Sequence, residues 1–170
     1  MPKLITQYVK IIDLICTKVG RITMYGVYLM MFILVLSFVT RNIINFPLMW
    51  IIEMAQFTMT AYYFLGGAYS MQMGDHVRMD LFYGNLSERG KAKIDIFTSA
   101  FLLFYLVTLL IGSVSSLIYT IETKQKLFTA WAPYVWPIKV LMLTGILLML
   151  LQTLSILFKD IAKLKGRKIN

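Results

Sequence analysis

The chain has 170 residues, which suffices for one domain, and 59% of them are hydrophobic. Because soluble domains are only about 45–50% apolar, much of this chain needs a solvent other than water. The net charge of +9 would suggest nucleic acid on a soluble protein. Here the basic residues flank long apolar runs, so we expect anionic lipid headgroups, not nucleic acid, as the counter-charge. One cysteine and one histidine exclude an intrachain disulfide and a haem held by two histidines.

The first twenty residues alternate between apolar and charged positions at helical spacing. Lysines and Asp13 fall largely between apolar side chains that recur every three or four residues. The apolar positions are Leu4, Ile5, Tyr8, Ile12, Ile15 and Val19. This pattern predicts an amphipathic helix over residues 1–20 that lies in the membrane interface. A cytoplasmic extension packed on another protein is the alternative.

Four later segments are long and apolar enough to cross a hydrocarbon core of about 30 Å as helices. They are residues 22–40, 50–73, 96–121 and 140–158. Glu53 is the only charged residue within them. The sequence therefore predicts an all-α integral membrane protein with a single membrane domain, residues 1–170, in which residues 159–170 form a basic tail.

Lysines and arginines are distributed unevenly between the segments that join the spans. They gather before the first span, in the second loop and in the tail, and are fewer in the first and third loops. The positive-inside rule places the basic side in the cytoplasm. We therefore expect both termini inside the cell, in a multi-pass protein with an up-down-up-down arrangement.

Glu53 is the first candidate for chemistry, because intramembrane carboxylates are costly and often functional. It follows Pro47 closely, at the expected extracytoplasmic start of its helix. The helix dipole favours a carboxylate there, and free backbone N–H groups can bind it. Arg41, on the same side, is a possible ion-pair partner. We favour this structural interpretation over a proton-coupling role.

The most polar internal stretch is residues 74–80, which contains His76, Arg78 and Asp80. His76 and Asp80 are four residues apart, so on a continuing helix they would share a face and could bond. A hydrogen-bonded cytoplasmic helix end is the simpler interpretation, and a proton relay through His76 is the alternative.

The third loop combines interfacial aromatic residues with two prolines. Its sequence positions of interest are Trp131, Pro133, Trp136 and Pro137. Tryptophan favours the membrane interface, and proline prevents an ordinary helix there. The loop is expected to anchor the protein at the interface, to present a rigid extracytoplasmic surface to a partner, or both.

Small residues mark possible helix contacts. Gly66, Ser70 and Gly74 are spaced by four on the second span, and Gly112 and Ser116 repeat this spacing on the third. Such faces let membrane helices approach closely. No phosphate-binding loop, nucleophile motif, zinc-type spacing or dinucleotide fingerprint accompanies them, so an enzyme is not expected.

The order of these motifs resembles the small membrane subunit, DctQ-type, of the tripartite ATP-independent periplasmic (TRAP) transporters. The resemblance covers nearly the whole chain and rests on motif order relative to four spans. The motifs are Trp50-x-x-Glu53, Gly66-Gly67-Ala68-Tyr69, Gly74-x-His76-Val77-x-x-Asp80 and Trp131-x-Pro133-x-x-Trp136-Pro137.

The resemblance implies a place in the bacterial inner membrane and a partnership there. In this family the small subunit pairs with a large membrane subunit that holds the substrate and sodium sites and moves as an elevator. A periplasmic binding protein delivers an organic acid such as a C4-dicarboxylate or a sialic acid. The matching positions are then expected to have structural and docking roles, and this chain itself to bind no cofactor.

Two other functions compete with this one. A self-sufficient proton-coupled multidrug exporter would use Glu53 as its coupling carboxylate. A membrane anchor subunit of a redox complex is the other, although the lone His76 argues against haem.

Overall fold

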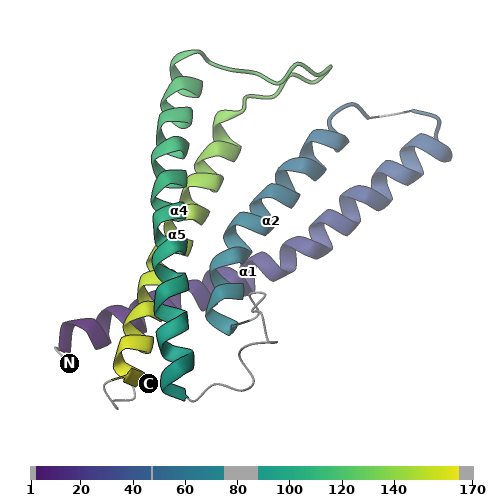
Figure 1. The fold of residues 1–170 in the computed structure, drawn as a ribbon. Helices are drawn as coiled ribbons and strands as arrows, with labels where there is room; N and C mark the ends of the chain where they lie inside the picture. The colour runs from purple at the N-terminus through teal and green to yellow at the C-terminus, as the bar shows by residue number, and fades with distance from the viewer. Residues whose placement is uncertain (1–2, 47, 75–87, 165–170) are drawn as a thin grey trace.

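The computed structural model describes residues 3–46, 48–74 and 88–164, and its regular elements there are helices (Figure 1). They are α1 (Lys3–Asn42), α2 (Ile51–Met73), α4 (Glu88–Glu122) and α5 (Trp136–Leu164). The all-α prediction is therefore confirmed for the described part of the chain.

The helices form two antiparallel pairs that meet at one end. Helix α1 pairs with α2 and α4 pairs with α5, while α5 also contacts both α1 and α2. Figure 1 shows the pairs diverging toward the end that carries the 43–50 and 123–135 connections. The first residues of α1 and the last residues of α5 lie at the other, convergent end (Figure 1). The convergent end holds an apolar cluster of Ile12, Cys16 and Ala68 with residues of α5 packed against it.

Of the described helices, three are long and apolar enough to cross a membrane: α1 from Leu4, α4 from Ile94, and α5. Helix α2 is not among them. Its 23 residues include Glu53, Gln56 and Gln72, which lower its apolar content. The predicted spans 22–40, 96–121 and 140–158 thus lie in apolar helices of sufficient length. The span predicted at residues 50–73 is helical, but its crossing of the membrane stays a prediction.

Helix α1 differs from the expected arrangement because it is continuous. The sequence predicted an interfacial helix to residue 20 and a separate span from residue 22, whereas the structure joins them in one 40-residue helix. Gly20 does not break it, since a single glycine costs a helix only about 1 kcal/mol. That cost is offset where Gly20 makes room for Tyr69 of α2. An interfacial position for residues 1–20 stays a prediction.

Helix α5 extends beyond the predicted end of its span. The basic tail was expected from residue 159, but the helix continues to Leu164. Lys159 and Lys163 are in this extension, and both form ion pairs within the chain. The beginning of the predicted tail is therefore part of the helix bundle.

Candidate functional site

At the convergent end of the bundle, the carboxylate of Asp13 joins α1 to α5. Asp13 accepts hydrogen bonds from Gln152 Nε2 at 3.1 Å and Ser155 Oγ at 3.2 Å, and it forms an ion pair with Lys159 Nζ at 2.5 Å. Charge-assisted bonds of this kind are about twice as strong as neutral ones. Tyr8 adds a bond from its hydroxyl to the Leu151 carbonyl at 3.2 Å. The crossing of α1 and α5 is thus fixed by polar contacts at several points.

Sequence reasoning missed this cluster, although a signal was present. Asp13 is the only acidic residue among the first 40. Gln152, Ser155 and Lys159 are spaced by three and four on α5, so they share one helical face. An isolated acid and a polar stripe on a distant helix are complementary. Pairing them requires knowing that α1 and α5 cross.

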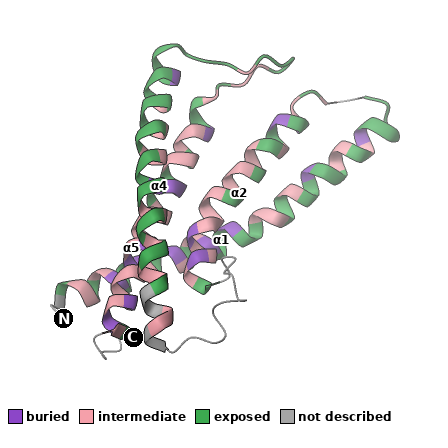
Figure 2. Cartoon of the chain, viewed as in Figure 1, coloured by how far each residue is buried: buried purple, intermediate pink, exposed green. Residues whose placement is uncertain are grey.

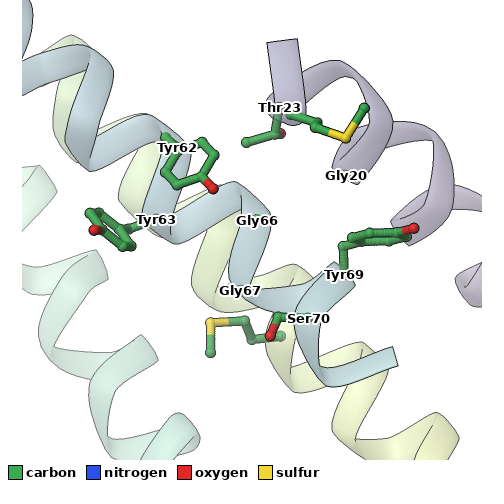
Figure 3. Close-up of a pocket in the computed structure, with 10 residues that line it drawn as sticks. Gly20, Thr23, Tyr62, Tyr63, Gly66, Gly67, Tyr69 and Ser70 are labelled. Carbon is green, nitrogen blue, oxygen red and sulfur yellow. The ribbon is translucent and has the colours of Figure 1, made fainter. Parts of the chain in front are cut away.

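Helices α1 and α2 contact each other at intervals of three residues. Thr17 and Gln72 exchange side-chain hydrogen bonds, and Gly20 lies against Tyr69. Three residues further along α1, Thr23 faces Gly66. A half-open cavity of about 540 Å³ lies along this contact, lined mainly by α1 and α2, with Met149 from α5 (Figure 3). Glycines and tyrosines make up most of its lining.

Two glycines set how closely the helices approach, and sequence reasoning had singled out neither. A Cβ on Gly20 would lie 2.3 Å from the Tyr69 ring. A Cβ on Gly145 of α5 would lie 2.7 Å from the Phe64 carbonyl oxygen of α2. Such distances are well inside van der Waals contact, so only glycine fits without a shift. At Gly145 the neighbour is backbone, which makes it the tighter constraint.

The predicted small-residue contacts are only partly formed. Gly66 packs near Thr23 at an ordinary distance, and Ser70 lines the cavity with it. Gly74 instead ends α2 in the left-handed conformation, with φ of 79°, and no described residue approaches its Cβ position within 4 Å. A glycine at such a position serves helix termination, and a contact role for Gly74 stays a prediction. Gly112 on α4 likewise has no described residue within 4 Å of its Cβ position.

Glu53 lies in the first turn of α2, as predicted, and its side chain is only 4% exposed. The structure forms no ion pair between Glu53 and Arg41, which is exposed at the end of α1. Glu53 Oε2 has no hydrogen-bond partner among the described residues, and Trp50 before it provides no side-chain cap. The helix dipole at the start of α2 favours a carboxylate at this position.

The third loop is an ordered hairpin. Leu127 N donates to Pro133 O at 3.0 Å and Val135 N donates to Gln125 O at 3.1 Å, around an isolated β-bridge between Lys126 and Tyr134. Trp131 and Trp136 are about half exposed, and Phe128 is fully exposed. Helix α5 begins at Trp136, so Pro137 stands in its first turn, where its missing N–H costs nothing.

Other predicted positions lie outside the described residues, namely His76, Arg78 and Asp80. Over the described ranges, no group of three or more His, Cys, Asp or Glu side chains is placed to hold a metal ion. Figure 2 shows instead that exposed residues cover much of α1 and α4, while buried residues gather where α1, α2 and α5 meet. The arrangement therefore provides wide apolar surfaces and a crossing of α1, α2 and α5 that is fixed by polar contacts and close approach.

The comparison with protein families agrees with these features. The model described as tripartite ATP-independent periplasmic transporters, DctQ component, matches residues 30–163. The comparison with curated proteins found no match. The family is one of transporter components and not of enzymes. Since the match covers most of the chain, including all or part of every described helix, the protein belongs to the DctQ family, the small membrane subunits of TRAP transporters.

Proposed function

We propose that this chain is the scaffold that braces the large membrane subunit of a TRAP transporter. That partner would hold the sodium and substrate sites and import an organic acid of the C4-dicarboxylate or sialic acid type. A periplasmic binding protein would deliver the substrate. Both termini of this chain would be cytoplasmic, so that the 123–135 hairpin faces the periplasm.

The apolar surface of α4 carries this proposal. Helix α4 packs on α5 through residues such as Leu106 and Thr120, which are buried. Its other sides present large apolar residues to the surroundings, and Phe104 is 75% exposed. Helix α1 exposes a comparable set, including Phe32 and Phe38. A scaffold needs apolar faces of this kind for lipid and for a partner, and it needs no charge near the middle of the membrane.

The fixed crossing of α1, α2 and α5 supports a bracing role. The Asp13 contacts and the Gly145 approach fix α1, α2 and α5 to one another at the convergent end. A partner that moves during transport would push against a helix group whose angles are set. The scaffold can then remain stationary while the large subunit moves.

An affinity purification of the chain from native membranes in mild detergent tests the proposal. We expect one large multi-helix membrane protein in about equal amount, identified by mass spectrometry. Recovery of the chain alone as a stable homodimer would refute the scaffold function. The same sample tests the redox alternative, because a haem-bearing complex absorbs visible light.

The exporter alternative draws on one observation. Glu53 Oε2 is buried and has no hydrogen-bond partner among the described residues. Its test is Glu53→Gln, which keeps the shape and removes the charge. We expect organic-acid uptake by the complete transporter to stay within about twofold of wild type, because a first-turn carboxylate contributes only about 0.3–1 kcal/mol through the dipole. Loss of transport of a hydrophobic cation by the chain alone would favour the exporter.

A further inference from the structure

A groove of about 400 Å³ lies where the end of α4, the hairpin and the start of α5 meet. It is lined by Thr120, Ile121, Lys124, Tyr134 and Trp136. The groove is separate from the cavity between α1 and α2, and no role described above uses it. Its lining combines a cation, two aromatic residues with polar tips and an apolar wall.

The polar groups at the base of the groove are already bonded to one another. Thr120 Oγ1 lies 2.8 Å from the Ser116 carbonyl and 3.2 Å from Gln125 Oε1. The Lys139 ammonium, 2.5 Å from Thr120 Oγ1, also donates to the Ser116 hydroxyl and carbonyl. These three contacts use the three N–H groups of the ammonium. Lys139 therefore contributes positive charge beside the groove and no free donor.

The rim of the groove, in contrast, offers donors. The Lys124 ammonium, the Tyr134 hydroxyl and the Trp136 indole N–H form no hydrogen bond with another described residue. Lys126 Nζ lies 4.8 Å from the centroid of the Tyr134 ring and adds a further positive charge. Between residues 116 and 139 the only acid is Glu122, which is exposed. A ligand with acceptor oxygens and negative charge complements this rim.

The surroundings indicate that such a ligand also has a hydrocarbon part. Ile121 lines the groove, and Ile118, one turn earlier on the same face of α4, is about half exposed. The hairpin leaves the end of α4 sideways, across the helix axes (Figure 1). Trp131 and Tyr134 on it, and Trp136 at the start of α5, are partly exposed, as aromatic residues at a membrane surface are. This position is at the level of lipid headgroups if α4 and α5 cross the bilayer.

We propose that the groove binds the phosphate of an anionic phospholipid, with an acyl chain lying along Ile121 and Ile118. Lys124 supplies the charge-assisted hydrogen bond, and Tyr134 of the hairpin and Trp136 of α5 complete the contact. Bound lipid then ties the hairpin to the ends of α4 and α5. This inference goes beyond the scaffold function and does not require the large subunit.

Photo-crosslinking tests the site on the full chain as it is purified, with any partner that accompanies it. The probe is a phosphatidylglycerol that carries a diazirine on one acyl chain, and adducts are mapped by peptide mass spectrometry. We expect adducts on α4 near Ile118 and Ile121. Unlabelled phosphatidylglycerol should compete for them, whereas phosphatidylcholine and inorganic phosphate should not.

Three variants isolate the charge. Lys124→Gln should lower the adduct yield at this site about tenfold, the effect of losing one charge-assisted hydrogen bond. Lys124→Arg should keep it within about threefold, since guanidinium also binds phosphate. Lys18→Gln, which removes an exposed lysine of α1, is the matched control and should change nothing here. Equal yields in wild type and Lys124→Gln, or equal competition by phosphatidylcholine, would overturn the proposal. Displacement by inorganic phosphate would instead assign the groove to a soluble anion.

Discussion

Helix α5 packs against α1 and α2 on one side and against α4 on the other, and the two contacts are built differently. Toward α1 and α2 it uses a glycine under a backbone carbonyl and the Asp13 network. Toward α4 it uses mainly apolar packing, with Lys139 bonded to Ser116 and Thr120 near one end. Close approach and several polar bonds specify an angle, whereas apolar packing between helices permits more variation. We infer that the α1–α2–α5 crossing is the fixed part of the bundle.

The largest effect should come from Gly145→Ala, which places a methyl group against the backbone of α2. The new Cβ would lie 2.7 Å from Phe64 O, and backbone cannot move aside as a side chain can. Overpacking costs about 1–3 kcal/mol and occasionally more, and a backbone neighbour places Gly145→Ala at the upper end of that range. A net loss of about 2 kcal/mol or more remains after the roughly 1 kcal/mol that alanine gains over glycine in a helix. Unfolding of the purified chain in detergent by increasing denaturant measures the change.

Gly67→Ala is the matched control for that prediction. It lies in the same α2–α5 contact, but its Cβ would meet the Met149 sulfur at 3.1 Å, and a methionine end is flexible. We expect a clearly smaller loss of stability than for Gly145→Ala. If both variants unfold alike, backbone proximity at Gly145 is not the constraint we describe.

Asp13→Asn should have the next largest effect. It removes the charge that binds Lys159, at a partly buried position, and leaves that ammonium without its ionic partner. The loss should be about 1–2 kcal/mol, because the asparagine oxygen can still accept from Gln152 and Ser155. Cys16, the single cysteine, is buried beside this crossing, so its rate of labelling by a maleimide reports opening. We expect faster labelling in Asp13→Asn, and the rate should return toward wild type when Lys159→Met is added.

The sequence predicted the helices well and their contacts poorly. Uncharged apolar runs mark α1, α4 and α5 because lipid accepts little else, and the prolines near Trp136 mark the irregular loop before α5. Contacts between helices depend on which helix faces meet, and the sequence position of a glycine does not identify the residue that packs against it. Gly74 and Gly145 look alike in the sequence, yet one ends a helix and the other lies beneath a backbone carbonyl. Asp13 was visible as a charge, but its partners are more than 130 residues away.

Lys139→Met tests the contact between α4 and α5 and should lower the stability of the chain moderately. It removes the bonds from the ammonium to Ser116 and to Thr120, near the end of α4 where a cation also complements the helix dipole. We expect a loss of about 1 kcal/mol, since the methionine stem preserves much of the packing. Maleimide labelling of Cys16 should stay at the wild-type rate, because the change lies at the divergent end. Faster labelling would mean that the two contacts are not independent.

Gly112→Ala should have the smallest effect and the opposite sign. Gly112 is an exposed residue inside α4, and no described residue lies within 4 Å of its Cβ position. Alanine should therefore raise the stability of the isolated chain by about 0.5–1 kcal/mol through helix propensity alone. A decrease in stability would show that α4 packs more tightly against the rest of the chain than it does in the structure. The same variant probes the partner, because a membrane subunit seated against this face would meet the added methyl group. Unchanged recovery of the large subunit with Gly112→Ala places its contact elsewhere, whereas reduced recovery from a stabilised chain assigns it to the exposed face of α4.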